Sequence, residues 1–305
     1  MLSVAEGIIL EQKYCGYIGL IGRPNVGKST LLNNFLGQKL SITSRKAQTT
    51  RHRILGINNK GNHQLVYVDT PGIHAGSKKA MNKIMNKSAT MTISDVDVVV
   101  FLMDSLRHTE EDEYVLEKLS RTNVPIILAL NKVDKLKDIS TVLPMIDLMR
   151  HKHNFVDIIP LSAKTGFNVE ALETRLCELI PEGEHLFYKD QLTDRPTKFL
   201  ISEFVREKIF RLLGDELPYS VTVDIEKVEH SKDLCKISAL ILVDKENHKR
   251  MIIGNQGSKL KAIGMSARLE IEALLEKKVF LQLWVKVKQG WSDDVRVLKQ
   301  LGYDD

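Results

Sequence analysis

The glycine-rich run "GRPNVGKS", Gly22 to Ser29, constrains the fold of this chain more than any other feature. The apolar run "YCGYIGLI" before it is typical of a buried strand, and residues 28–36 after it are typical of a helix. A strand, a G-x-x-x-x-G-K-S loop and a helix in this order form a P-loop. The sequence therefore predicts an α/β domain with a phosphate-binding loop at the end of its first strand.

Five further apolar runs continue the alternation of strand and helix as far as residue 180. Strands are expected at "RILGINN", "HQLVYVD", "VDVVVFLMD", "VPIILALN" and "FVDIIPLS". Helices are expected at 28–36, 78–91, 110–120 and 168–180. The turn "KGN" predicts an antiparallel hairpin, whereas the other strands predict a mostly parallel sheet covered on both faces. This P-loop domain is expected to span residues 1–180.

Residues 181–196 contain proline, glycine and mixed charge without periodicity, which predicts a linker. Residues 197–305 then predict a smaller α+β domain in the order α-β-β-α-α-β plus one helix, with the first helix ending at Gly214. On the strand "VFLQLWVKV", Trp284 shares a face with Phe280 and Lys286. We expect the last helix to pack over this face; stacking of Trp284 on a nucleic-acid base is the alternative.

Composition excludes some classes of protein and leaves nucleic-acid binding open. The net charge is +5, but residues 181–305 hold 21 basic and 21 acidic residues, so net charge does not mark that half as an RNA binder. The apolar runs are too short to span a bilayer, and the first residues lack the basic start of a signal peptide. Cys15, Cys177 and Cys235 lie far apart, which indicates free thiols in a reducing compartment.

The P-loop carries the residues expected to hold nucleotide phosphates. Lys28 would bridge the outer phosphates, while the Ser29 hydroxyl would bind Mg²⁺. The complete set expected in this loop is Gly22, Asn25, Val26, Gly27, Lys28, Ser29 and Thr30. The loop alone does not distinguish ATP from GTP.

Two further segments complete the expected phosphate and metal site. "DTPG" follows a predicted strand, so Asp69 is placed to bind the metal and the Gly72 N–H to meet the γ-phosphate. The basic segment "SITSRKAQTTRHRI" should supply a threonine that coordinates Mg²⁺ when GTP is bound, and we choose Thr50 over Thr49. The expected metal ligands are Ser29, Thr50 and Asp69. The segment would order with GTP and relax after hydrolysis, as a switch.

Two motifs select the base. "NKVD" and "SAK" each follow a predicted strand, and they contribute Asn131, Lys132, Asp134, Ser162, Ala163 and Lys164. The Asp134 carboxylate can accept hydrogen bonds from N1–H and the N2 amino group of guanine, and the Ala163 N–H can donate to O6. Adenine lacks these donors and would leave the aspartate unpaired, so the pocket is predicted to prefer guanine.

These motifs, with "QTTRHRI" as it stands, resemble the Era family of GTPases. The likeness continues through "ELPYSVTV" and "LQLWVKVKQGWSDD" and covers the chain from about Tyr14. It implies hydrolysis of GTP to GDP and a C-terminal type II K-homology (KH) RNA-binding domain. It also implies binding to the 3′ end of small-subunit (16S) ribosomal RNA and a role in small-subunit assembly in a bacterial cytoplasm or an organelle. A monomer in peripheral contact with the inner face of the plasma membrane is a further expectation.

The catalytic machinery departs from that of Ras-like switches. Ile73 stands immediately after D-x-x-G, where such switches carry the glutamine that orients the attacking water. One interpretation is slow hydrolysis that relies on positioning and Mg²⁺ alone. The other is that Asn25 helps to hold a K⁺ ion, as in similar GTPases. The catalytic candidates are Asn25, Lys28, Thr50, Asp69 and Gly72.

A second glycine loop lies in "KRMIIGNQGSKLKAIG", residues 249–264. Six basic residues and one acidic residue lie between Lys245 and Arg268, and a G-x-x-G loop of this kind clamps about four nucleotides in KH folds. Ser258 is expected to cap the next helix. The expected RNA contacts are Gly254, Asn255, Gln256, Gly257, Ser258, Lys259 and Lys261. The family typically has lysine where Gln256 stands, and the alternative is a glycine-capped turn with a solvated basic face.

The two loops give two hypotheses about function. The first is a GTP-switched, RNA-binding assembly factor. The second is a GTPase signalling module whose C-terminal domain docks on proteins or a membrane. A tRNA-modifying enzyme is disfavoured, because the chain has no candidate nucleophile or cofactor motif beyond the nucleotide site.

Overall fold

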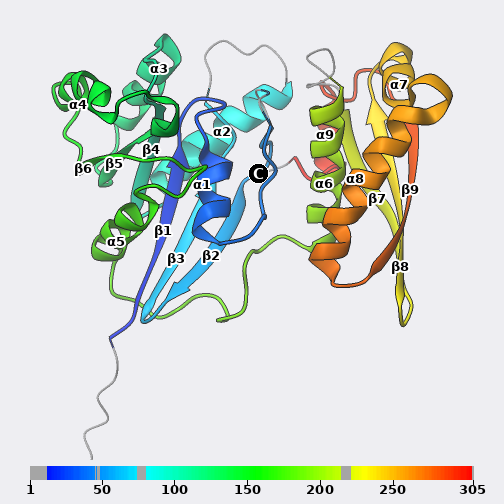
Figure 1. Cartoon of the computed structure of the whole chain (residues 1–305), viewed down its shortest axis with the longest axis horizontal. Coiled ribbons are helices and arrows are strands. Elements are labelled where there is room, and N and C mark those ends of the chain that lie inside the picture. Colours follow the sequence, from blue (N-terminus) through cyan, green and yellow to red (C-terminus); the bar gives the residue numbers. More distant parts are fainter. Residues whose placement is uncertain (1–11, 45, 47–48, 74–79, 214–220, 304–305) are drawn as a thin grey trace, which may run out of the picture.

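The computed structural model describes residues 12–44, 46, 49–73, 80–213 and 221–303, and Figure 1 shows two α/β units side by side. The strands are β1 Tyr14–Ile21, β2 Ile54–Lys60, β3 His63–Asp69, β4 Val98–Asp104, β5 Ile126–Asn131, β6 Asp157–Pro160, β7 Val221–His230, β8 Leu234–Val243 and β9 Lys278–Val287. The helices are α1 Lys28–Phe35, α2 Ala80–Ser94, α3 Glu110–Leu119, α4 Leu143–Arg150, α5 Val169–Leu179, α6 Thr197–Leu212, α7 Glu246–Ile253, α8 Ser258–Leu275 and α9 Val295–Gln300. Short 3₁₀ turns cover Val133–Lys135, Ile139–Val142 and Asn255–Gly257.

The first sheet has the strand order β2-β3-β1-β4-β5-β6. Only the β2–β3 pair is antiparallel, which confirms the predicted hairpin on a mostly parallel sheet. Because β1, β3, β4 and β5 run the same way, their carboxyl ends share one edge of the sheet. That edge carries Gly22, Asp69, Asp104 and Asn131, and it is where the expected nucleotide motifs meet.

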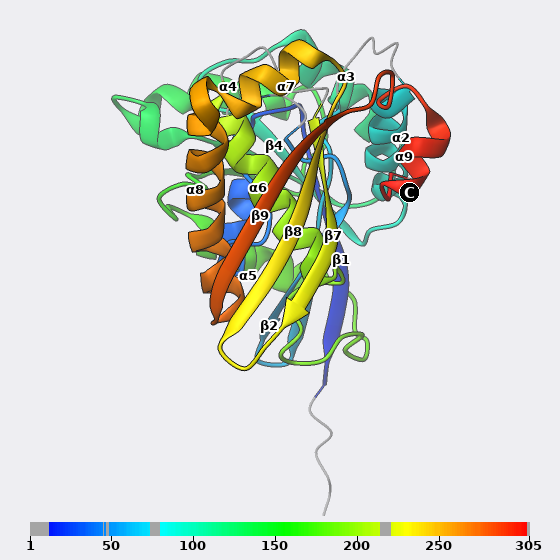
Figure 2. The same ribbon diagram turned by 90° about the vertical axis from the view of Figure 1, so that its right-hand side faces the viewer.

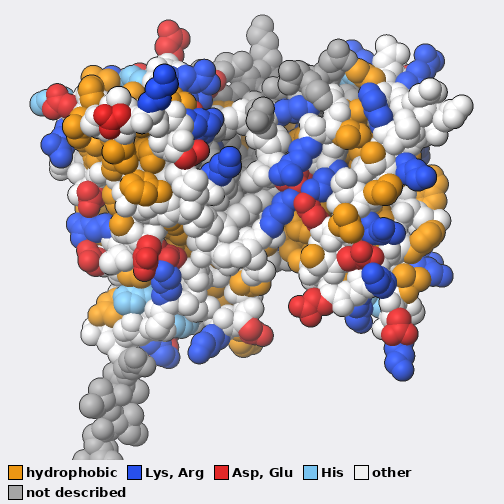
Figure 3. Space-filling model, in the orientation of Figure 1, with side chains coloured by type: hydrophobic (Ala, Val, Ile, Leu, Met, Phe, Trp, Pro, Cys, Tyr) orange, Lys and Arg blue, Asp and Glu red, His pale blue; other side chains and the backbone are white. Residues whose placement is uncertain are grey.

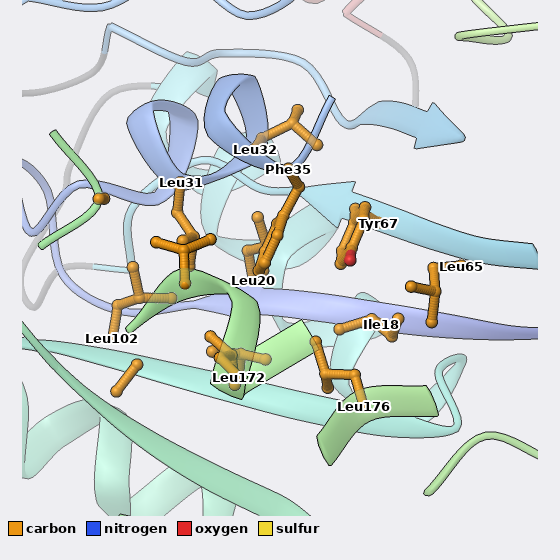
Figure 4. Close-up of a cluster of buried hydrophobic side chains, with 14 of the residues drawn as sticks. Ile18, Leu20, Leu31, Leu32, Phe35, Leu65, Tyr67, Leu102, Leu172 and Leu176 are labelled. Carbon is orange, nitrogen blue, oxygen red and sulfur yellow. The ribbon is translucent and has the colours of Figure 1, made fainter. Parts of the chain in front are cut away.

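Helices α1 and α5 cover one face of this sheet. Leu31 and Phe35 of α1 and Leu172 of α5 are buried against β1 and β3 (Figure 4). The Phe35 ring stacks on Tyr67 of β3 with the centroids 4.3 Å apart. The packing fixes α1, and with it the P-loop from which α1 starts.

The other face of the sheet packs against α2, α3 and α4 through a second apolar cluster that includes Ile93, Val115 and Met149. We did not predict α4. The expected helix start at residues 78–79 and the expected helix end at Gly214 lie outside the described residues.

The second unit is a three-stranded sheet with the order β7-β8-β9. Its first pair is antiparallel and its second parallel, and α6 and α8 pack on one face of it. The element order matches the predicted α-β-β-α-α-β plus one helix. None of the helices in the described part of the chain combines the length and apolar character needed to cross a bilayer.

The last helix does not cover Trp284, so this expectation was wrong. Trp284 is 47% exposed, and no helix of the described chain lies over its face of the sheet (Figure 2). Instead α9 crosses to the first unit, where Leu298 and the preceding Trp291 are buried with Met81 and Met85 of α2. The apolar stripe of α2 offers these side chains more complete burial than a strand face bearing lysines.

Residues 181–196, the predicted linker, lie along the edge of the first sheet. The Ile57 N–H of β2 donates to the Leu192 carbonyl at 2.9 Å. The Gln64 side-chain carbonyl accepts from the N–H groups of Leu186 and Phe187 at 2.8 and 3.0 Å. The segment is therefore attached to the first unit over most of its length.

Replacing Trp291 with alanine is expected to release α9 from α2. The indole is 1% exposed, and the loss of such a side chain costs about 3–5 kcal/mol. Faster hydrogen exchange at the Val295–Gln300 amides would report the release. Trp284→Ala is the matched control and should leave exchange in α9 unchanged. Unchanged protection in the Trp291→Ala variant would contradict a role for this cluster in holding the helix.

Candidate nucleotide and RNA sites

A cavity of about 550 Å³ lies at the carboxyl edge of the first sheet. The predicted residues that line it are Asn25, Gly27, Lys28, Ser29, Thr30, Thr50, Gly72, Asn131, Lys132, Asp134, Ala163 and Lys164. Four others are buried behind this lining: Gly22, Val26, Asp69 and Ser162. The structure thus brings the residues of all the predicted nucleotide-binding motifs together at this cavity.

The P-loop can pack against Asn131 because Gly27 has no side chain. Gly27 has φ +112°, and a Cβ there would come within 2.2 Å of the Asn131 amide nitrogen. The Lys28 ammonium lies inside the loop and donates to the carbonyls of Gly22 and Arg23 at 2.9 and 3.0 Å. These are the bonds that phosphate oxygens would replace.

Lys28 is fully buried, and burial lowers its pKa to about 8. The nearby Asp69 carboxylate partly opposes this shift, whereas Arg23 adds to it. Phosphate oxygens would restore the preference for the charged ammonium.

The carboxylate of Asp69 gathers hydroxyl groups from two other segments. Its Oδ2 accepts from Ser29 and Ser41 at 2.7 Å, and the Thr50 hydroxyl lies 2.8 Å from that of Ser29 and 3.5 Å from Oδ2. Its Oδ1 is buried without a hydrogen-bond partner among the described residues. Burial raises the Asp69 pKa, and the hydrogen bonds from the hydroxyls offset part of the rise. The Asp69 Oδ1 atom, buried without a partner among the described residues, and the nearby hydroxyls of Ser29 and Thr50 suit a hard cation such as Mg²⁺.

The geometry favours Thr50 over Thr49 as the metal-directed threonine. The Thr49 hydroxyl is used elsewhere, since it lies 2.6 Å from the Ser44 hydroxyl and donates to the Lys46 carbonyl at 2.7 Å. Ser41, which we did not predict, is completely buried on Asp69. A serine between Leu40 and Ile42 was the only trace of this contact in the sequence.

The base-binding motifs are joined by hydrogen bonds. Asn131 donates to the Val26 carbonyl at 2.7 Å and accepts from the Ala163 N–H at 2.9 Å. The Ser162 hydroxyl holds one Asp134 oxygen at 2.7 Å, and the carboxylate is exposed at the cavity. The Ala163 N–H, which we expected to donate to guanine O6, must be shared with or released by Asn131.

The position after D-x-x-G has no catalytic side chain. Ile73 is completely buried in the cluster between the sheet and α2, and its N–H donates to the Gly22 carbonyl at 3.3 Å. Asn25 is exposed at the cavity with φ +64°, and its carbonyl accepts from Lys132 at 2.7 Å. Arg107, which we did not predict, also lines the cavity.

The switch segment also contacts α6 of the second unit. Arg206 donates to the Thr49 carbonyl at 2.5 Å, and the buried Glu207 accepts from the Thr43 N–H at 2.9 Å and pairs with Lys39. Arg51 donates to the Val221 carbonyl at 2.8 Å. At the surface, basic side chains with acidic ones among them lie where the two units meet (Figure 3).

Charges in α6 were the signal for this interface in the sequence. Burial would raise the Glu207 pKa, but the bonds from Lys39 and Thr43 hold it below its usual value. Glu203, Arg206, Glu207 and Lys208 are all buried on a helix that we took only as the start of a domain.

The second glycine loop connects α7 to α8. Gly254 has φ +71°, and a Cβ there would lie 2.7 Å from Lys259. Gln256, with φ +46°, and Gly257, with φ +78°, also adopt left-handed conformations. Ser258 is not the N-cap, contrary to our expectation: Gly257 holds that position and Ser258 is the first helical residue. Because Gly257 takes a left-handed conformation at the N-cap, helix α8 starts at Ser258, one residue earlier than expected.

A groove of about 420 Å³ runs from this loop between α8 and β9. Gly257 and Lys261 line it, and residues that we had not assigned to the site, Gly264, Arg268 and Phe280, continue it. Asn255, Gln256, Ser258 and Lys259 are exposed beside its entrance, next to Gly254. The groove thus has an apolar floor, a basic rim and a backbone loop at one end, a combination that suits single-stranded RNA.

Family models match parts of both units. Residues 17–132 match a family model described as 50S ribosome-binding GTPase, and residues 216–292 match one described as KH domain. The chain is 50% identical to the GTPase Era of Yersinia enterocolitica over 297 residues, covering 97% of this chain and 98% of that protein.

Two solved structures are similar over nearly the whole chain. One is an Era in complex with MgGDPNP and nucleotides 1506–1542 of 16S ribosomal RNA, at 39% identity and a TM-score of 0.93. The other is a single-residue variant of Aquifex aeolicus Era bound to GDP·AlF4⁻, at 39% identity and a TM-score of 0.92. Each alignment covers 95% of this chain and 99% of the other.

Nucleotide affinity is expected to fall as the pH rises from about 7 to about 9. Free Lys28 loses its proton through a pKa of about 8, whereas bound phosphates keep it charged, so binding takes up a proton above that pH. Calorimetric titration with GDP in two buffers of different ionisation enthalpy measures this uptake. Lys28→Met should bind weakly and without the pH dependence. A pH-independent affinity in the unmodified protein would show that free Lys28 stays charged.

Proposed function

The chain belongs to the GTPase Era family, and from this premise we propose that it binds the 3′ end of small-subunit ribosomal RNA and assists small-subunit assembly. The observation that supports this most is the likeness, over nearly the whole chain, to an Era bound to MgGDPNP and 16S ribosomal RNA. The protein is a GTPase with a C-terminal KH domain. The cavity of the first unit would bind guanine nucleotide, and the groove of the second unit would bind RNA.

The nucleotide site would hold Mg²⁺ through Ser29, Asp69 and, with GTP bound, Thr50. The metal would offset charge on the phosphates, while Lys28 bridges the outer ones and the Gly72 N–H meets the γ-phosphate. The hydroxyls around Asp69 support this ligand set. The exposed Asp134 carboxylate, which the Ser162 hydroxyl orients, would select guanine.

A K⁺ ion held by Asn25 is part of the proposal for hydrolysis. Ile73 is buried away from the cavity and has no group that could orient water, so charge in the transition state needs another source of stabilisation. Asn25 lies at the cavity and is fixed in a left-handed conformation, which supports a fixed role for its side chain.

GTP turnover is expected to be faster in K⁺ than in Na⁺ by on the order of 10-fold or more, the scale of one well-placed electrostatic contact. Phosphate release under saturating GTP and Mg²⁺ gives the rate. Asn25→Gly keeps the left-handed backbone but removes the side-chain carbonyl, so it should lower the K⁺ rate to that in Na⁺. Equal rates in the two salts for the unmodified protein would exclude the K⁺ site.

The groove beside the Gly254–Gly257 loop is proposed as the RNA site, with Gly254, Asn255, Gln256, Gly257, Ser258, Lys259 and Lys261 as contacts. Both glycines take φ angles that favour glycine, and the loop lies at one end of the basic-rimmed groove. Gln256 cannot supply the ionic contact of the lysine typical of the family, so phosphate attraction falls to Lys259 and Lys261.

Gly254→Asp with Gly257→Asp is expected to abolish RNA binding and leave GTP hydrolysis intact. The carboxylates would repel phosphates where the backbone must approach them. Fluorescence anisotropy with the 3′-terminal ribosomal RNA sequence measures binding. Gly61→Asp is the matched control for the change at Gly257, because both glycines have positive φ and open space around a Cβ, but Gly61 lies in the hairpin of the first sheet. Retained RNA affinity in the double variant would favour the signalling-module hypothesis.

The remaining parts of the proposal concern organisation and location. Residues 1–180, 181–196 and 197–305 would form the GTPase domain, linker and KH domain, which agrees with the separate sheets on either side of residues 181–196. Action as a monomer on the small ribosomal subunit in the cytoplasm, with peripheral contact to the plasma membrane, has its support in the family resemblance.

A further inference from the structure

Tyr303 is buried between the predicted switch segment and the KH domain. Its side chain is 3% exposed, and its N–H donates to the Leu298 carbonyl of α9 at 2.9 Å. Its hydroxyl lies 3.4 Å from the Arg51 guanidinium and 3.4 Å from the Thr222 hydroxyl of β7. Its ring stacks on the His52 ring with the centroids 4.3 Å apart. One side chain thus contacts the switch segment and the KH sheet at the same time.

The two residues that Tyr303 contacts in the switch segment follow Thr50 directly in the chain. Both are buried, with Arg51 3% and His52 6% exposed. Arg51 also donates to the Val221 carbonyl of β7 at 2.8 Å. Consecutive Cα atoms are only about 3.8 Å apart, so a backbone that is fixed at Arg51 restricts where Thr50 can lie.

Thr50 occupies the position that a ligand of Mg²⁺ would need. Its hydroxyl lies 2.8 Å from that of Ser29 and 3.5 Å from Asp69 Oδ2. The contacts of Tyr303 and this position of Thr50 therefore occur in one conformation. Contacts that hold a conformation raise its population, and a nucleotide that needs that conformation then binds more tightly.

The residues before Tyr303 contact the helix that follows the other γ-phosphate motif. Helix α9 packs on α2, the first described helix after "DTPG", and Figure 2 shows the two helices side by side. Trp291 is buried against Met85 there, and the Ala80 N–H at the start of α2 donates to Asp293 Oδ1 at 3.3 Å. Residues 291–303 thus contact both the switch segment and α2.

We propose that Tyr303 is a positioning residue for Thr50, and that it raises the affinity for GTP relative to GDP by holding the switch segment in the conformation that binds Mg²⁺. This inference rests on the proposed role of Thr50 as a metal ligand. Thr50 would coordinate Mg²⁺ only when the γ-phosphate is present, so GDP gains nothing from the contacts of Tyr303. Tyr303 is not among the described residues that line the nucleotide cavity, so its effect passes through Arg51 and His52.

A purely structural role for Tyr303 predicts a different result. Tyr303 belongs to the apolar cluster that joins α9 to α2, and its loss would then only loosen this packing. GTP and GDP affinity would change alike, because both nucleotides use the P-loop and the base pocket. The hydroxyl would matter little, because the ring supplies the apolar contacts.

The test compares the affinities of the full chain, in Mg²⁺, for a non-hydrolysable GTP analogue and for GDP. Tyr303→Ala should lower the ratio of these affinities on the order of tenfold, with the GDP affinity unchanged. Tyr303→Phe keeps the ring but removes the hydroxyl beside Arg51, and should lower the ratio about threefold, the scale of one hydrogen bond. During turnover the KM for GTP should rise in proportion while kcat stays the same, because saturating GTP restores the conformation.

Two further variants serve as controls. Tyr67→Phe removes a buried tyrosine hydroxyl whose partner, 3.0 Å away, is Glu173 of α5, and it should leave the affinity ratio unchanged. Thr50→Ala should lower the ratio at least as much as Tyr303→Ala. Adding Tyr303→Ala to Thr50→Ala should cause little further loss, because the two residues act through the same contact.

The outcomes separate this inference from the proposed metal site. Equal losses of GTP-analogue and GDP affinity in Tyr303→Ala, or no loss of either, would overturn the inference and leave Thr50 as a ligand. A full further loss on adding Tyr303→Ala to Thr50→Ala would also overturn it, because Tyr303 would then act independently of Thr50. An unchanged ratio in Thr50→Ala would instead show that the proposed role of Thr50 is wrong, and the inference would fall with it.

Discussion

The segment between Lys39 and Arg51 is held from two sides, by the nucleotide site and by the KH domain. On one side the Thr50 hydroxyl lies 2.8 Å from that of Ser29, at the site that suits Mg²⁺. On the other side Arg206 of α6 donates to the Thr49 carbonyl at 2.5 Å. Adjacent residues thus contact the nucleotide site and the KH domain. A change at the γ-phosphate that moves Thr50 must change what α6 contacts.

The charges of this junction also make each unit depend on the other. Glu207 is completely buried, and it is neutralised by Lys39 of the first unit and by Lys208 and Arg211 of its own helix. Burial of a carboxylate costs free energy that only such partners offset. If the predicted switch segment withdrew, Glu207 would lose Lys39 and the Thr43 N–H together. The position of the KH domain is therefore sensitive to the conformation of the segment.

Local patterns in the sequence predicted most of the fold and the nucleotide site. Strand β3 followed by Asp69, and β5 followed by Asn131, are local features that a parallel sheet brings to one edge. Contacts between segments that are distant in the sequence gave weaker signals in the sequence pattern. Ser41 on Asp69 and Arg206 on Thr49 depend on how separate elements pack, and the helix expected over Trp284 found a better apolar partner on α2. Periodicity shows which face of an element is apolar, but not which of two apolar surfaces it meets.

Few packed elements lie between the nucleotide site and the proposed RNA groove. Helix α6, which contacts the switch segment, is joined to α8 by the Lys208–Glu270 ion pair and by a shared apolar core. Helix α8 begins at the Gly254–Gly257 loop and supplies Lys261 and Arg268 to the groove. Helix α6 thus lies between the predicted switch segment and the helix that lines the proposed RNA groove. Because α8 is rigid and packed on α6, a shift of α6 would move the groove as a unit, and RNA bound in the groove would in turn bias the switch segment.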